Sequence, residues 1–190
     1  MCFVMGVNLA WVAVRGASEI DVNQYFSIEA TEAVAQSPRS EITRIAPNDE
    51  WQVYVFTDIN NPLLNADDLE DLSYYGEVIS VLAFENSMLS QVTKFKENKL
   101  HWKIKWAEQS LKCIGEDKEE LAMLIDRIAG CEFEGPIDIA NDIVGYRHDY
   151  HYQAPYVVME EVPLSYVIAQ LVPPRSVFLN FSSSHERKKN

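Results

Sequence analysis

The sequence predicts a single α+β domain built around a largely antiparallel sheet, against which a few helices pack. Three observations support this prediction. The chain has 190 residues, the length of one domain, and 47% of them are hydrophobic, which is enough for a real core. Runs of strand-like segments come first and the best helical patterns follow, an order that favours the α+β class. The clearest strand signal is a three-stranded meander over residues 77–106.

The N-terminal part is predicted to supply short strands and two short helices. We expect strands over residues 7–14, 27–35, 40–46 and 51–56. Ser18 can cap a short helix that ends near Phe26. Glu19 and Asp21 fall in its first turn, where the helix dipole favours acidic side chains. Residues 66–73 read as a second, acidic helix.

The meander is predicted from residues 77–85, 88–97 and 99–106. In its last strand Leu100, Trp102, Ile104 and Trp106 alternate with Lys99, His101, Lys103 and Lys105. A hairpin that pairs Lys96 with Lys99 would place Lys94 opposite His101 and gather basic side chains on one face. This predicted basic face consists of Lys94, Lys96, His101, Lys103 and Lys105. Like charges opposite one another are unfavourable in a sheet. The face is therefore either solvated, or covered by the acidic helix at 66–73 or by an acidic partner.

The C-terminal part is predicted to hold the strongest helix, over residues 116–129, where Asp117 and Glu120 form a capping box. A second helix begins at Pro136 and is closed by Gly145. Further expected elements are strands over residues 110–114 and 154–159 and a short helix over residues 164–171. We assign residues 1–181 to the domain and residues 182–190 to a flexible polar tail.

Charge and cysteine content restrict the class of protein. The net charge of −13 argues against non-specific binding to nucleic acid or to anionic membranes. Cys2, Cys113 and Cys131 are odd in number and widely spaced, so we expect no disulfide framework and a cytoplasmic location. The apolar start lacks the basic segment and cleavage site of a signal peptide and is too short to span a bilayer.

Three motifs together resemble a family of uncharacterised bacterial proteins. They are WVAVRG at residues 11–16, the meander that begins GEVI at residues 76–79, and a short helix that runs into GYRHD at residues 145–149. The resemblance covers roughly residues 7–160, with Tyr146 in place of a more usual Phe and with a longer C-terminal extension. The family brings no established activity, so the resemblance supports the fold and implies nothing about function.

The densest group of reactive side chains lies at residues 146–152, and its candidate binding residues are Tyr146, Arg147, His148, Asp149 and His151. Imidazole and carboxylate groups suit first-row metals. In an extended segment, however, His148 and His151 point to opposite faces and no third strong ligand lies nearby, so no metal site is expected. The alternatives are structural ion pairs of Arg147 and Asp149, or a binding surface, since Tyr and Arg are enriched at hot spots.

No other pattern indicates catalysis. There are only 7 Gly residues and no glycine-rich phosphate loop, no G-x-S-x-G motif is present, and Cys113 and Cys131 sit among apolar residues. An enzymatic activity stays open but is not favoured, and no cofactor is expected.

These observations favour protein–protein interaction as the function. A small, acidic, cytoplasmic domain of bacterial type with no catalytic motif would suit an immunity-type protein that neutralises a basic toxin, because complementary charge speeds association. The alternative is a small-ligand-binding protein or an enzyme that uses the cluster at residues 146–152. A third possibility is a structural subunit that assembles through the edge of the sheet. The oligomeric state is open.

Overall fold

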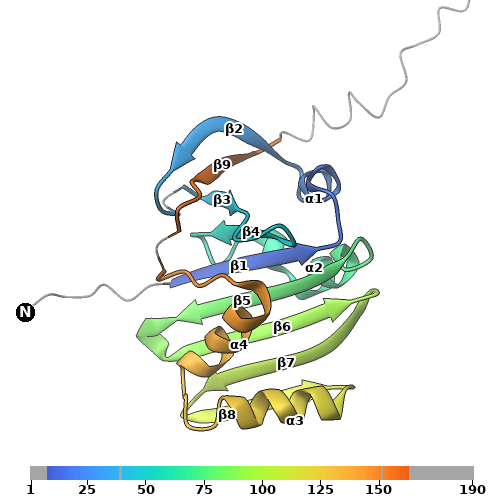
Figure 1. Ribbon diagram of the computed structural model, residues 1–190, viewed down its shortest axis with the longest axis vertical. Helices are drawn as coiled ribbons and strands as arrows, with labels where there is room; N and C mark the ends of the chain where they lie inside the picture. Colours follow the sequence, from blue (N-terminus) through green and yellow to red (C-terminus); the bar gives the residue numbers. More distant parts are fainter. Residues whose placement is uncertain (1–7, 39, 151, 163–190) are drawn as a thin grey trace, which may run out of the picture.

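The computed structural model describes residues 8–38, 40–150 and 152–162. They form a nine-stranded sheet in the order β2-β9-β3-β4-β1-β5-β6-β7-β8, with every neighbouring pair antiparallel (Figure 1). The strands are β1 (Asn8–Arg15), β2 (Ile28–Ala35), β3 (Ile42–Ile45), β4 (Trp51–Phe56), β5 (Glu77–Phe84), β6 (Leu89–Lys96), β7 (Lys99–Ala107), β8 (Ser110–Gly115) and β9 (Tyr156–Glu161). The helices are α1 (Glu19–Phe26), α2 (Ala66–Leu72), α3 (Lys118–Arg127) and α4 (Glu134–Val144), and two 3-10 turns are η1 (Pro62–Leu64) and η2 (Glu85–Ser87). The predicted α+β class is confirmed.

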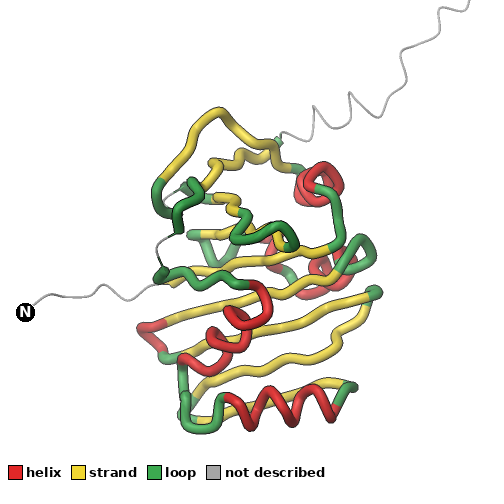
Figure 2. Tube along the Cα trace, in the orientation of Figure 1, coloured by secondary structure: helices red, strands yellow, loops and turns green. Residues whose placement is uncertain are grey.

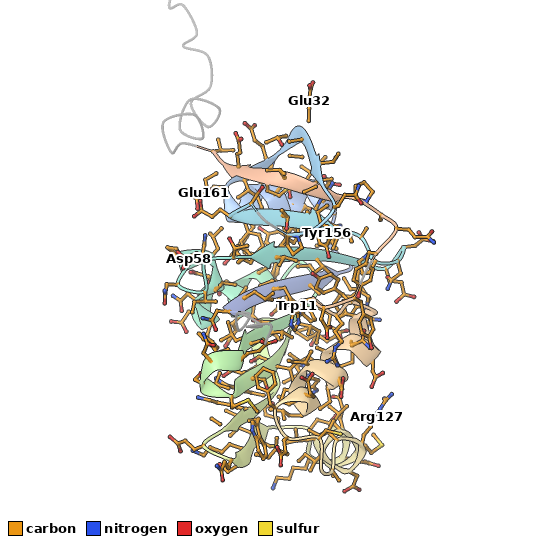
Figure 3. All side chains as sticks on the ribbon, turned by 90° about the vertical axis from the view of Figure 1, so that its left-hand side faces the viewer. Trp11, Glu32, Asp58, Arg127, Tyr156 and Glu161 are labelled. Carbon is orange, nitrogen blue, oxygen red and sulfur yellow. The ribbon has the colours of Figure 1, made fainter. Side chains whose placement is uncertain are left out.

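The central strand β1 sends alternate side chains into two cores, one on each face of the sheet. Trp11 lies in the core that contains Leu121 of α3 and Ile139 of α4. Val12 lies in the core that contains Phe26 of α1, together with buried leucines of α2. Figures 1 and 2 show α3 and α4 in front of the β5–β8 half of the sheet, and Figure 3 shows Trp11 near the middle of the molecule. The period-two pattern of β1 thus places helices on both faces.

Two predicted N-caps are present. The Oγ of Ser18 accepts a hydrogen bond from the N–H of Asp21 (3.1 Å), and Oδ1 of Asp117 accepts one from the N–H of Glu120 (2.9 Å). The predicted capping box of α3 is only half formed, because the Glu120 carboxylate pairs with Lys94 of β6. Helix α3 is thereby tied to the sheet through its first turn.

Helix α4 begins at Glu134, two residues before the predicted start at Pro136. Pro136 still lies in the first turn, where the missing N–H has no intrahelical partner to lose. Gly145 closes the helix as expected: its φ is 75°, and its N–H donates to the carbonyl of Asn141 (2.7 Å).

Two sequence-based expectations fall outside the described residues: the helix over residues 164–171 and the tail over residues 182–190. Within the described part of the chain, no helix combines the length and the apolar character needed to cross a membrane.

Candidate functional site

The predicted basic face does not form, because the β6–β7 hairpin changes register at His101. Near the turn, Lys96 lies opposite Lys99, as predicted. Strand β7 then holds one extra residue, so that Lys94 lies opposite Trp102 and not opposite His101. Such a bulge moves each later residue of the strand to the other face of the sheet. The prediction that the five basic residues share one face is therefore wrong.

Lys94 lies on the α3 side of the sheet, where this protein supplies its acidic partners. Its Nζ lies 2.9 Å from the carboxylate of Glu120 and 3.6 Å from that of Glu77, and only 15% of the Lys94 side chain is exposed. Burial by itself raises the pKa of Glu77, but the hydrogen bond from Arg15 and the charge of Lys94 outweigh burial and lower that pKa overall. The partners come from α3 and β5 and not from the acidic helix α2, and Lys94 is a structural residue.

Lys103 and Lys105 project from the opposite face of β7. Lys105 lies across from Lys112 of β8, and neither Lys103 nor Lys105 forms an ion pair with any residue that the structure describes. Burial lowers the pKa of Lys103, and the charge of Lys105 lowers it further. Lys96 is exposed at the end of β6, and His101 is half-buried at the bulge. Of the five residues of the predicted basic face, Lys103 and Lys105 thus remain together on one face without an ion pair to any described residue.

Arg147, in the second predicted cluster, ties the loop after α4 back to that helix. Its guanidinium pairs with the carboxylates of Glu134 and Asp138, and its Nε lies 2.8 Å from Oδ1 of Asp149. Its backbone N–H donates to the hydroxyl of Tyr152 (2.6 Å). Burial raises the pKa of Asp149, but the hydrogen bond and charge of Arg147 outweigh burial and lower it overall. These contacts fit the structural alternative for this cluster.

Tyr146 is fully buried at the base of the same loop. Its ring centroid lies 5.3 Å from that of Trp11 in an edge-on contact and 5.1 Å from that of Tyr152 in a stacked one. Its hydroxyl lies 3.3 Å from that of Tyr156. Burial raises the pKa of Tyr146, and the hydrogen bond with Tyr156 raises it further. Tyr146 is therefore a core residue that is not available to a ligand.

His148 is partly buried, and its Nδ1 has no hydrogen-bond partner among the described residues. Burial lowers the pKa of His148, which favours the neutral imidazole. Arg147, His148 and Asp149 do not line the hollow beside Arg44 or the three hollows around Glu132. In the described part of the chain, no group of three His, Cys, Asp or Glu side chains is placed to hold a metal. His151 lies outside the described residues.

A surface that the sequence patterns did not reveal lies beside α2. It combines the rings of Tyr25, Tyr74 and Tyr75 with the carboxylates of Asp68 and Asp71, and we call it the tyrosine–carboxylate surface. The ring centroids of Tyr25 and Tyr75 are 6.1 Å apart, and those of Tyr74 and Tyr75 are 5.4 Å apart, both in edge-to-face contact. Tyr74 is 75% exposed and Tyr75 is 45% exposed. Three aromatic rings thus form a continuous row at the surface.

Helices α1 and α2 position this surface. Leu69 and Leu72 are buried in the core, so the carboxylates of the short helix α2 face outward. The hydroxyl of Tyr25 in α1 donates to the backbone carbonyl of Asp68 (2.7 Å) and joins the two helices. Burial raises the pKa of Tyr25, and the negative charges of Asp68 and Asp71 raise it further. The row of rings therefore lies within reach of the field of these carboxylates.

The charge of this surface is not neutralised by neighbouring side chains. The acidic residues of α2 are Asp67, Asp68, Glu70 and Asp71. None of them forms an ion pair with another residue in the described ranges. The only sequence signal was an acidic helix followed by Tyr-Tyr, and a sequence pattern does not show whether such rings are exposed.

Compared with models of known protein families, with curated proteins and with solved structures, the chain matches none of them.

Proposed function

We propose that this protein binds a basic protein partner through the tyrosine–carboxylate surface, in an immunity-type role in which it neutralises that partner. The observation that carries the proposal is the row of Tyr25, Tyr75 and Tyr74 beside the unpaired carboxylates of α2. Tyrosine is enriched at interface hot spots because it offers a large, stiff contact area with one polar end.

Charge supports a basic partner. The chain carries a net charge of −13, and the four acidic side chains of α2 add a local negative field at the aromatic row. Opposite charge on a partner would steer its approach and raise the association rate, an effect that salt screens. The toxin-neutralising role rests on the small size of the domain, its acidity and the lack of a catalytic motif.

The test is binding to the product of the gene next to its own, measured by surface plasmon resonance at several salt concentrations. The double variant Tyr74→Ala, Tyr75→Ala should weaken the affinity by about 2 kcal/mol, or about 30-fold in Kd, because it removes two exposed hot-spot rings. The double variant Asp68→Asn, Asp71→Asn should mainly slow association and flatten its salt dependence.

The matched control is Tyr150→Ala. Tyr150 is 55% exposed and lies over Arg147, in the cluster that the ligand-binding alternative would use. It should leave the affinity unchanged. If Tyr150→Ala weakens the affinity as much as the double variant does, or if the Tyr74 and Tyr75 substitutions leave it unchanged, the tyrosine–carboxylate surface is not the binding site. Co-expression should also relieve any growth arrest that the neighbouring gene product causes, and failure to do so would reject the neutralising role.

A further inference from the structure

Three hollows meet at one residue, Glu132, in the loop between α3 and α4. Their volumes are about 660, 400 and 230 Å³. Trp106 lines the first two, Met88 lines the first and third, and Glu132 lines all three. Because they share lining residues, the hollows adjoin one another, and we treat them together as one groove. We call it the Trp106 groove and define it by Met88, Trp106, Leu111, Ile125, Asp126 and Glu132.

The floor of the groove is apolar. Trp106 is half-buried and packs against Phe133 and Ile137, which fix the indole in place. Leu111 lines the same hollow as Trp106. Met88 is 51% exposed at the other side of the groove, and its unbranched thioether can adapt to different bound groups. A concave apolar surface with a few polar groups is typical of binding sites.

The rim of the groove is acidic. Asp126 and Glu132 are exposed and form no ion pair with any residue that the structure describes. Among the residues that the structure describes, Glu108, also at the rim, pairs with the exposed ammonium of Lys112 alone, at 3.5 Å. A positively charged ligand in the groove would therefore meet the carboxylates of Asp126 and Glu132 close to the indole ring of Trp106.

Four residues that line the first hollow have a backbone φ in the left-handed region, namely Met88, Glu108, Gln109 and Glu132. Met88 has a φ of 49° and Glu132 a φ of 40°, in the left-handed region that non-glycine residues seldom adopt. Glu108 and Gln109 form the two-residue turn between β7 and β8, and Met88 caps η2, so turn geometry accounts for these three.

We propose that the Trp106 groove binds a segment of a protein partner that carries a lysine or arginine flanked by apolar residues. The aliphatic stem would lie on Trp106 and Met88, and the cation would meet Asp126 and Glu132, combining cation–π attraction with charge pairing. The site is separate from the tyrosine–carboxylate surface. The backbone N–H of Asn98, in the turn just before β7, donates to Oγ of Ser73, the neighbour of Tyr74, whereas Trp106 lies near the other end of β7.

The test uses Trp106 as its own reporter. The chain has four tryptophans, and Trp11, Trp51 and Trp102 are no more than 2% exposed, so acrylamide should quench mainly the fluorescence of Trp106. The probe is the peptide acetyl-Ala-Leu-Lys-Leu-Ala-amide, with Arg and Glu in place of Lys as comparison peptides. The Lys and Arg peptides should shift the emission and protect Trp106 from acrylamide, and the Glu peptide should do neither.

The double variant Asp126→Asn, Glu132→Gln should raise the Kd of the Lys peptide about tenfold, since two exposed charge pairs contribute together about that factor. Glu29→Gln, an exposed acid on β2, is the matched control and should change nothing. Both substituted side chains of the double variant are exposed, so the fold should persist, and an unchanged melting temperature would confirm this.

Equal protection by the Lys and Glu peptides, or an unchanged Kd in the double variant, would overturn the proposal. Equally tight binding of n-butylammonium would overturn the peptide assignment in favour of a small-molecule site. The variant with Tyr74 and Tyr75 replaced by Ala should bind the Lys peptide normally. Peptide binding therefore tests the Trp106 groove independently of the proposed function. Weaker binding of the partner protein to the Tyr74 and Tyr75 variant tests the proposed function independently of the groove.

Discussion

Replacement of Arg147 with methionine should destabilise the fold, because it removes the one guanidinium group that pairs with three carboxylates. The Arg147 side chain is only 13% exposed, whereas Glu134, Asp138 and Asp149 are 51%, 39% and 49% exposed. Because solvent screens each pair, we assign at most about 1 kcal/mol to each. Methionine keeps much of the packing of the stem but leaves the carboxylates to repel one another. We expect a loss of about 2–3 kcal/mol in the free energy of unfolding.

This loss should depend on pH, because the pKa of Asp149 is lower in the folded protein than in the unfolded chain. A carboxyl group with a lowered folded pKa stabilises the fold above its unfolded pKa of about 3.9, and that stabilisation disappears as the pH falls through the folded pKa. Acid removes the interaction from the wild type, and the variant has already lost it. The difference in stability between the two proteins should therefore shrink as the pH falls from about 5 to about 2.

Urea unfolding followed by tryptophan fluorescence measures both effects. The matched control is Arg127→Met. Arg127 is 59% exposed and pairs with Asp142 alone, at 2.8 Å, so its replacement should cost less than about 1 kcal/mol. Equal losses for Arg147→Met and Arg127→Met, or a loss at Arg147 that stays constant in acid, would refute the view that this network ties the loop to α4.

Three further predictions test other features. Lys94→Met should lower the free energy of unfolding by about 1 kcal/mol and Lys105→Met should leave it almost unchanged, because of these two lysines only Lys94 forms an ion pair among the described residues. Equal losses of stability in urea titrations would contradict the observed register. Gly76→Ala would place a Cβ 2.2 Å from a backbone oxygen of β1 and should lower the free energy of unfolding by about 3 kcal/mol or more. Gly130→Ala has open space around its Cβ but a φ of 86°, so it should lower that free energy by only about 1 kcal/mol. Calorimetry would compare the two variants, and a larger loss for Gly130→Ala would contradict the close approach at Gly76. Burial raises the pKa of the Cys113 thiol, so its alkylation by iodoacetamide, in a variant without the other cysteines, should reach half its maximal rate at a higher pH than that of a small-molecule thiol.

The prediction of the basic face failed at one residue, and the reason is local. Strict alternation over residues 99–106 is a sound signal for a strand, and β7 covers that segment. Alternation predicts which face each side chain occupies only where the strand pairing is regular. The bulge at His101 shifts the pairing of β7 with β6 by one residue. The bulge leaves no composition signal in the sequence, because it depends on how β6, β7 and β8 fit together.

Both surfaces proposed for binding escaped sequence reasoning for a related reason. Tyr74 and Trp106 read as ordinary aromatic residues, and an aromatic residue is more often buried than exposed. The row of Tyr25 and Tyr75 joins residues of α1 and of the turn after α2, which are far apart in the sequence. The Trp106 groove likewise gathers residues from β7, β8, α3, the residue after η2 and the α3–α4 loop.

The sequence by itself determined the α+β class, nearly all the strands and helices of the described residues, and the caps at Ser18, Asp117 and Gly145. These follow from periodicity and local hydrogen bonding, which act between near neighbours in the chain. Only the tertiary structure decided that Lys94 finds its acids in α3 and β5, and that Arg147 closes a structural network. It likewise decided which aromatic residues are exposed, because register, burial and charge pairing depend on segments that meet only in the folded chain.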